Sequence, residues 1–148
     1  MYKKVSTDMN FVDREKQIEK FWDDNHIFEK SMEEREGCPD YIFYDGPPTA
    51  NGKPHLGHVL TRVIKDMIPR YRTMKGSMVP RKAGWDTHGL PVELEVEKLL
   101  GLDGKDQIEE YGLEPFIDKC KESVWKYKGM WEDFSGTVGF WADMDDPY

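Results

Sequence analysis

One stretch of this chain constrains its fold more than any other. Residues 41–58 read YIFYDGPPTANGKPHLGH, which is a short apolar run, a loop rich in glycine and proline, and the start of a helical pattern. A strand that leads through such a turn into a helix brings unpaired backbone N–H groups and the positive end of the helix dipole to one point. That arrangement is typical of an anion site, so the stretch predicts nucleotide or phosphate binding.

The first turn of this predicted helix carries two histidines, His55 and His58. Residues three apart lie on the same helical face, so both rings can donate hydrogen bonds to one anion. Gly57 lacks the Cβ that would keep a flat base or a ribose away from the backbone. The alternative to phosphate binding is that one histidine is a helix cap and the other a surface residue. A zinc site is not expected, because H-E-x-x-H and further ligands at metal spacing are absent from the sequence.

A second loop, residues 82–91, follows a second apolar run and contains GWDTHGLP. Loops after neighbouring parallel strands emerge at the same edge of the sheet, where doubly wound folds bind their ligands. Asp86, between an aromatic and a hydroxyl residue, is suited to hold an ammonium group. A capping aspartate beside a core tryptophan, Trp85, is the alternative, and both interpretations stay open at this point.

The remaining pattern alternates strands and helices. We expect strands over 42–44 and 78–81, helices over 12–26, 56–75, 92–100 and 114–134, a connector over 31–40, a capping segment over 103–111 and an acidic turn over 143–148. Asp13 is the expected cap of the first helix. The expected buried face of the helix over 56–75 consists of Val59, Val63, Ile64, Met67 and Ile68.

Strand, helix, strand, helix is the order of a parallel sheet. The predicted fold class is therefore α/β: the first half of a doubly wound, Rossmann-like nucleotide fold with helices added at its N- and C-terminal ends.

Composition narrows the partners and the compartment. The net charge of −8 opposes attraction to a nucleic-acid backbone. No apolar run is long enough for a membrane span, and the first residues lack the apolar region of a secretory signal. Only two cysteines, Cys38 and Cys120, are present, so no disulfide framework is indicated and a cytoplasmic protein is expected.

Taken together, YDGPPTANGKPHLGH and AGWDTHGLPVELEVEK resemble two motifs of the class I aminoacyl-tRNA synthetases, in the branch specific for isoleucine, valine and leucine. His55-Leu56-Gly57-His58 is similar to the HIGH signature of that family, with leucine in place of isoleucine. The loop from Trp85 to Pro91, with the residues that follow it, resembles the isoleucine type more than the other two. The resemblance covers nearly the whole chain.

The resemblance implies roles for individual residues. His55 and His58 would hold the phosphates of ATP, which enters with Mg²⁺, and Gly57 would pack under the adenine. Gly46 and Pro47 would border the pocket for the aliphatic side chain of the amino acid. The residues of the second loop would bind the amino acid or support its site: Asp86 would pair with the α-ammonium group, and Trp85, Thr87 and His88 would support the loop.

The implied reaction is the ATP-dependent activation of L-isoleucine to isoleucyl-adenylate, followed by transfer to tRNA(Ile). By the same resemblance, residues 1–40 form a helical extension and residues 41–148 the first half of the catalytic domain. The editing domain, the half-fold with the KMSKS lysine loop and the anticodon-binding domain would lie outside this chain. The chain alone is therefore expected to be a poor or inactive catalyst with few contacts to RNA.

Three alternatives accompany this hypothesis. One is a fragment of a valine-type synthetase, and another is a stand-alone ATP-binding module without catalysis. A third is a small nucleotidyltransferase, since such enzymes also use H-x-G-H on a similar half-fold. The GWDTHGLP loop argues against the third, because an ammonium-holding loop has no evident use in cofactor adenylylation.

Overall fold

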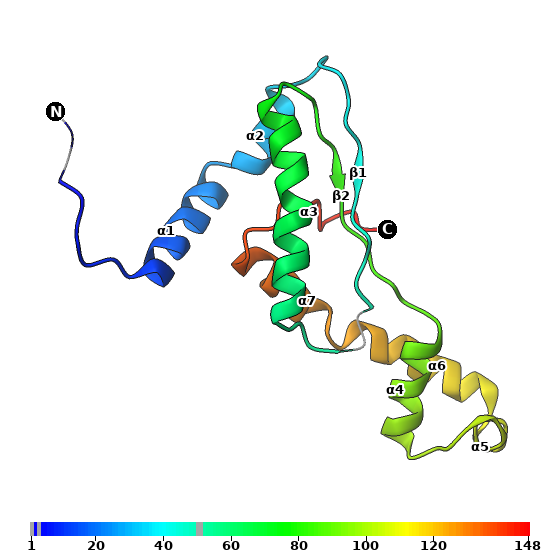
Figure 1. Cartoon of the computed structure of the whole chain (residues 1–148). Coiled ribbons are helices and arrows are strands. Elements are labelled where there is room, and N and C mark those ends of the chain that lie inside the picture. The colour runs from blue at the N-terminus through cyan, green and yellow to red at the C-terminus, as the bar shows by residue number, and fades with distance from the viewer. Residues whose placement is uncertain (1, 3, 50–51) are drawn as a thin grey trace.

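The structure, a computed structural model, describes residues 2, 4–49 and 52–148. They form the helices α1 (Phe11–Asp24), α2 (Ile27–Glu33), α3 (Leu56–Met74), α4 (Leu90–Leu100), α5 (Lys105–Tyr111), α6 (Leu113–Trp125) and α7 (Lys128–Thr137), and the strands β1 (Phe43–Tyr44) and β2 (Arg81–Lys82). Helix α3 runs alongside the strands, and α4, α5 and α6 gather at one end of the molecule. Helix α1 projects from the opposite side (Figure 1). Among the described residues, none of the helices has the length and apolarity that crossing a membrane requires.

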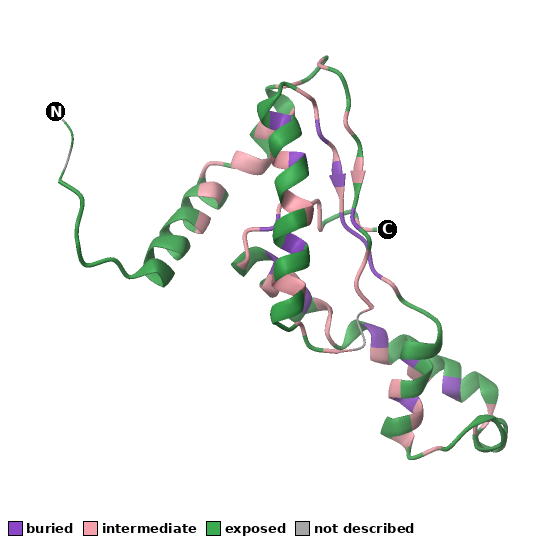
Figure 2. Cartoon of the chain, in the orientation of Figure 1, coloured by how far each residue is buried: buried purple, intermediate pink, exposed green. Residues whose placement is uncertain are grey.

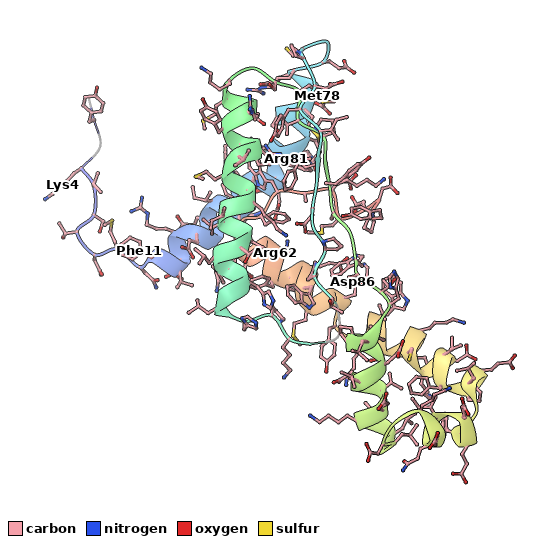
Figure 3. All side chains as sticks on the ribbon, turned by 45° about the vertical axis from the view of Figure 1, so that its right-hand side comes forward. Lys4, Phe11, Arg62, Met78, Arg81 and Asp86 are labelled. Atoms are coloured by element: carbon pink, nitrogen blue, oxygen red, sulfur yellow. The ribbon has the colours of Figure 1, made fainter. Side chains whose placement is uncertain are left out.

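The two strands belong to a longer pair of parallel segments. Phe43 lies opposite Arg81 in β1 and β2, and single bridges extend the pairing from Asp40–Met78 to Thr49–Asp86. Met78, Arg81 and Asp86 mark the course of the second segment beside α3 and on toward α4 (Figure 3). The parallel pairing predicted from the sequence is present, although the regular strands are shorter than predicted and β2 begins three residues later.

Residues 143–148 are a third extended segment rather than only the acidic turn that the sequence predicts. The Asp143 N–H donates to the Arg81 carbonyl at 2.8 Å, and the Tyr148 N–H donates to the Ala83 carbonyl at 3.1 Å. Trp85 N–H in turn donates to the Tyr148 carbonyl at 2.9 Å. The second segment therefore has a backbone neighbour on each side, and the C-terminal residues help to fix its course.

Helix α3 has nearly the predicted bounds, because local signals set both of its ends. At the start, His55 is the N-cap and Pro54 lies just before it. At the other end Gly76 has φ +91°, and the Ser77 N–H donates back to the Arg72 carbonyl at 3.1 Å. This left-handed closing turn satisfies the last carbonyls and favours glycine.

The predicted buried face of α3 is wrong. Val63, Ile64, Met67 and Ile68 are exposed, and the buried residues of the helix are Arg62, Pro69 and Thr73. Figure 2 shows α3 as largely exposed, with buried residues only at separate points along it. The polar side turns inward because it has partners there: Arg62 donates to Asp45 at 3.4 Å, and Arg81 donates to the Thr73 hydroxyl at 2.8 Å.

The N-terminal helices differ from the prediction in two details. Asn10, not Asp13, caps α1, because its side-chain oxygen accepts from the N–H groups of Val12 and Asp13. Residues 31–33, predicted as connector, continue helix α2. No residue of α1 is buried, and its Trp22 reaches Trp141 edge-on with the ring centroids 5.1 Å apart.

The predicted helix over 114–134 is two helices. It breaks at Lys126 and Tyr127, where α6 ends and α7 begins (Figure 1). A core cluster draws one residue from each of α4, α6 and α7 and one from the second loop, and consists of Trp85, Val92, Val124 and Trp131. The break lets Val124 and Trp131 approach one core from two helices, and it brings α7 close to the start of α3.

Gly84 lies where the C-terminal segment crosses the second one, and a Cβ there would come within 2.7 Å of the Tyr148 ring. Because that ring is held by a hydroxyl contact to the Asp45 carbonyl, it cannot easily move aside. We expect Gly84→Ala to lower the free energy of unfolding by about 1–3 kcal/mol, measured by urea denaturation and circular dichroism. Gly129→Ala, within α7 and with open space around it, is the matched control and should be neutral or stabilising. Equal effects of the two substitutions would contradict this packing.

Candidate functional site

The two histidines close the first turn of α3 on itself. The Gly57 N–H donates to His55 Nδ1 at 3.1 Å, and the His55 N–H donates to His58 Nδ1 at 3.0 Å, which forms a reciprocal capping box. The centroids of the two imidazole rings lie 3.8 Å apart. A Cβ on Gly57 would come within 3.1 Å of His55 Nδ1, so the missing side chain makes room for this cap.

These caps fix the tautomer of both rings. A ring nitrogen that accepts a hydrogen bond carries no proton, so each neutral imidazole has its proton on Nε2. Both His55 and His58 therefore offer an N–H donor on the side away from the helix. The capping role that the sequence left as an alternative is present, and it leaves the donor function intact.

A cavity of about 470 Å³ opens beside this turn. Its lining includes both histidines together with the side chains of Lys53, Arg62 and Lys65. The other lining residues come from the first loop, α3 and α7: Gly46, Pro48, Thr49, Gly52, Thr61 and Trp131. Several cationic or N–H donor groups and no carboxylate line it among the described residues, so the cavity is suited to an anion.

Asp45 holds this side of the molecule together. Its side chain is 2% exposed and accepts from Lys65 Nζ at 2.7 Å and from Arg62 Nη1 at 3.4 Å. The Lys65 ammonium also donates to the Gly46 carbonyl at 2.8 Å. The end of the first strand is thereby fixed to α3 by a buried ion-pair network.

Arg62 is embedded among aromatic rings. Its guanidinium carbon lies 4.5 Å from the centre of the Phe140 ring and 5.7 Å from that of Trp131. Burial lowers the pKa of Arg62, and the charge of Asp45 opposes this shift.

Trp131 also contacts the His58 ring edge-on, with the ring centroids 4.7 Å apart, and its indole N–H donates to the Gly52 carbonyl at 2.9 Å. Helix α7 thus forms one wall of the cavity.

The first and second loops are joined directly. The Asp86 N–H donates to the Pro48 carbonyl at 3.2 Å, and the Thr49 hydroxyl donates to Asp86 Oδ2 at 3.1 Å. Asp86 is half-buried, so its carboxylate keeps access to the surface of the site. Trp85 turns the other way into the core.

The structure brings some of the predicted site residues together and separates others. Gly46, His55 and His58 line the cavity. Asp86 does not line it but accepts a hydrogen bond from Thr49, which does. The remaining predicted residues do not line it: Pro47, Gly57, Trp85, Thr87 and His88. Sequence reasoning missed Asp45, Arg62 and Lys65. The i, i+3 spacing of Arg62 and Lys65 could have shown that the two cations lie on one face of the helix. It could not have shown that both pair with Asp45.

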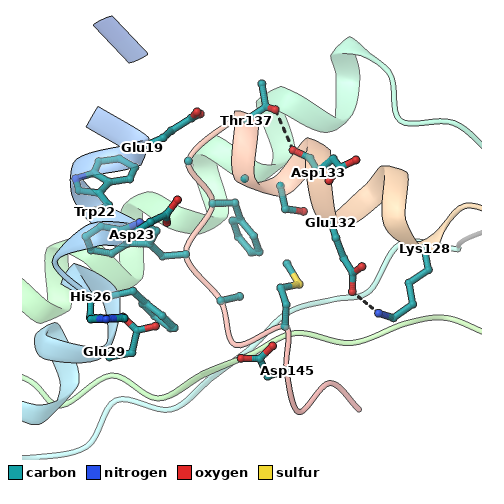
Figure 4. Close-up of a pocket in the computed structure, with 18 residues that line it drawn as sticks. Glu19, Trp22, Asp23, His26, Glu29, Lys128, Glu132, Asp133, Thr137 and Asp145 are labelled. Atoms are coloured by element: carbon teal, nitrogen blue, oxygen red, sulfur yellow. Dashed lines mark hydrogen bonds and ion pairs between the residues drawn. The ribbon is translucent and has the colours of Figure 1, made fainter. Parts of the chain in front are cut away.

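A larger cavity of about 1200 Å³ lies between α1, α2 and α7, and neither His55 nor His58 lines it (Figure 4). Six carboxylate residues line it: Glu19, Asp23, Glu29, Glu132, Asp133 and Asp145. Lys128 also lines it but is paired with Glu132. Because its charge would repel phosphate, this larger cavity is a poor candidate for the anion site.

Comparison with known proteins places this geometry in a family. The model of the family described as tRNA synthetases class I (I, L, M and V) matches residues 17–148. The chain belongs to this class I tRNA synthetase family. The histidine turn and both loops fall within the matched residues of the synthetase domain.

Relatives within the family are similar over the whole chain. The chain is 62% identical over 148 residues to an isoleucine--tRNA ligase of Clostridium novyi and 63% identical over 148 residues to that of Clostridium kluyveri. It is 60% identical over 146 residues to isoleucine--tRNA ligase 2 of Bacillus anthracis. These matches cover 99–100% of the chain and 14% of each relative. This synthetase segment therefore spans about one seventh of the length of these relatives.

A solved synthetase structure has the same fold. The LeuRS of Agrobacterium radiobacter K84, solved in a ternary complex with tRNA and LeuAMS, superposes with a TM-score of 0.61 at 18% sequence identity. The match covers 91% of this chain and 15% of that protein. The elements around the cavity thus follow a known synthetase architecture.

The neutral state of His58 predicts a pH dependence of stability. Burial lowers the pKa of His58 below its ordinary value of 6.5, and repulsion from His55 and Arg62 lowers it further. Because the folded state binds this proton more weakly than the unfolded state, the contribution to stability is complete above pH 6.5 and declines as the pH falls below it. We expect the free energy of unfolding from urea denaturation to drop between pH 7.5 and 5.5. We also expect an NMR titration of His58 with a midpoint below 6.5.

His58→Gln provides the control for this prediction, since its side chain can still accept from the cap N–H but does not titrate. The variant should lose part of the pH dependence. A His58 midpoint at or above 6.5 in the folded chain would contradict the assigned cap.

Proposed function

We propose that this chain carries the ATP and amino-acid binding elements of an isoleucine--tRNA ligase. The observation that supports it most is the cationic cavity at the capped histidine turn, in a chain about 60% identical throughout to ligases of that name. In this proposal residues 1–40 are a helical extension. Residues 41–148 are the first half of a doubly wound, Rossmann-like catalytic domain that precedes the editing insertion.

ATP, entering as its Mg²⁺ complex, would place its phosphates in the 470 Å³ cavity. The Nε2–H groups of His55 and His58 donate to phosphoryl oxygens, and Gly57 leaves room for the adenine. Lys53 and the start of α3 add positive potential. The acidic cavity on the other side of α7 does not compete for this ligand.

L-Isoleucine would lie between the two loops. Asp86 pairs with the α-ammonium group, while Gly46 and Pro47 border the aliphatic side chain. The hydrogen bond from Thr49 orients the Asp86 carboxylate before the substrate arrives. Trp85 anchors the second loop in the core, and Thr87 and His88, both exposed, support it.

The chemistry is then an in-line displacement. A carboxylate oxygen of isoleucine attacks the α-phosphorus of ATP and forms the C–O–P bond of isoleucyl-adenylate. The bond from that phosphorus to the bridging oxygen of pyrophosphate breaks, and its electron pair leaves with pyrophosphate. No side chain forms a covalent bond, so rate enhancement comes from positioning and from donors aimed at phosphoryl charge. Transfer to tRNA(Ile) follows in the longer enzyme, with few RNA contacts from this acidic segment.

The test uses a chimera in which this chain replaces the matching segment of the Clostridium novyi ligase, to which it is 62% identical. We expect isoleucine-dependent ATP–pyrophosphate exchange by the chimera. His58→Ala removes one donor to the phosphates and should lower kcat by about 100-fold.

The matched control for that substitution is His26→Asn. His26 is the N-cap residue of α2 but makes no side-chain capping hydrogen bond, does not line the 470 Å³ cavity and has φ +50°, a conformation that asparagine tolerates. Preference for valine over isoleucine would point to a valine-type enzyme. ATP binding without exchange would point to a binding module without catalysis.

The Asp86 role has its own test. In the same chimera, Asp86→Asn keeps the shape of the side chain and an acceptor for Thr49 but removes the negative charge. We expect the KM for isoleucine to rise about 30-fold or more, since an ammonium group would lose its ionic partner, with the KM for ATP changed less than about threefold. Asp118→Asn, on the exposed side of α6, is the control. An unchanged KM for isoleucine would assign Asp86 a structural role only.

A further inference from the structure

The side chain of Lys65 bridges α3 and the first loop. From the helix it reaches the strand end, where its ammonium group donates to Asp45 Oδ1 at 2.7 Å and to the Gly46 carbonyl at 2.8 Å. A Cβ on Gly46 would lie 3.9 Å from the same ammonium nitrogen. The loop backbone therefore rests against the end of this lysine side chain.

The loop that follows Asp45 has few ways to be held against α3, although Asp45 itself is joined to the second segment through the Lys82 carbonyl and to the C-terminal segment through the Tyr148 hydroxyl. Pro47 and Pro48 have no backbone N–H and cannot donate to a neighbouring element. The far end of the loop is tied to Asp86 through the Pro48 carbonyl and the Thr49 hydroxyl. At the near end, the described contacts that tie the loop to α3 are those of Lys65 and the longer 3.4 Å contact between Arg62 and Asp45.

We propose that Lys65 is a positioning residue that sets the distance of the Gly46-Pro47 backbone from α3 and thereby the size of the amino-acid pocket. This inference rests on the proposed function, in which that backbone borders the aliphatic side chain. Lys65 would then act on the choice between isoleucine and valine, which differ by one methylene, without touching either. A shift of the loop by a fraction of an ångström is enough to change such a pocket, because packed interiors respond to single methylene groups.

Lys65 also lines the cavity, so a direct contact with phosphate is the competing role. The two roles predict different kinetic effects of a substitution at Lys65. A lysine that binds phosphate controls the affinity for ATP, whereas a lysine that holds the loop controls the affinity and selectivity for the amino acid. Two of the three ammonium donors already have protein acceptors, which favours the positioning role.

The experiment compares Lys65→Met, Lys65→Arg and Lys75→Met in the chimera with the Clostridium novyi ligase. Lys65→Met keeps the length of the side chain and removes its charge and donors. We expect it to raise the KM for isoleucine about tenfold or more and to lower the ratio of kcat/KM for isoleucine over valine about fivefold. The KM for ATP should stay within about threefold. Lys65→Arg keeps the charge and should recover most of both losses.

Lys75→Met is the matched control, since Lys75 is exposed at the other end of α3. It should change neither parameter. Circular dichroism of each variant verifies folding, and Lys65→Gln, which keeps an uncharged amide donor group, replaces Lys65→Met if the latter does not fold.

The outcomes separate this inference from the proposed function. Absence of isoleucine-dependent exchange in the unsubstituted chimera would sink the proposed function itself. If the parent chimera is active, a rise confined to the KM for ATP overturns the positioning role in favour of a phosphate contact. Equal losses for isoleucine and valine with an unchanged ratio overturn it as well, because a merely structural lysine would not alter selectivity.

Discussion

The buried carboxylate of Asp45 is the interaction on which the rest of this arrangement depends. An ionised carboxylate inside a protein is costly unless it is paired and hydrogen-bonded, so the first strand can end here only if α3 brings Lys65 and Arg62 across it. The backbone of the same residue extends the network. Its N–H donates to the Lys82 carbonyl at 2.9 Å, and its carbonyl accepts from the Tyr148 hydroxyl. One residue thus joins α3, the second segment and the C-terminal segment.

The features that the sequence predicted correctly have local causes. The end of α3 follows from Gly76, and its start follows from the capping side chains of His55 and His58. The parallel order of the two segments follows from the alternation of strands and a helix. The two helix ends depend on residues within a few positions of one another, and the parallel order depends only on the succession of elements, so a single sequence is enough to find them.

The features that it predicted wrongly depend on distant partners. The apolar pattern of α3 shows that the helix has two unlike faces but not which face meets the strands. Arg62 is buried because Asp45, 17 positions earlier, needs a charge partner. In the site, the histidines and the two loops were predictable, whereas the Trp131 wall comes from 79 positions beyond Gly52. The pairing of Asp143 with Arg81 also joins residues that are far apart in the sequence. Locally, the run of aspartates and a proline in the C-terminal segment favours a turn.

Net charge was a poor guide to the character of the site because the charges are segregated. The chain carries −8 overall, yet cations and histidines line the smaller cavity while carboxylates gather around the larger one. The caps add a second level of control, since they hold His55 and His58 as neutral donors. On the proposed function, this has a kinetic consequence. Cationic rings would bind ATP tightly in the ground state, and binding shared equally by substrate and transition state does not raise kcat. Fixed neutral donors avoid that excess affinity and can still strengthen as charge moves onto the leaving pyrophosphate.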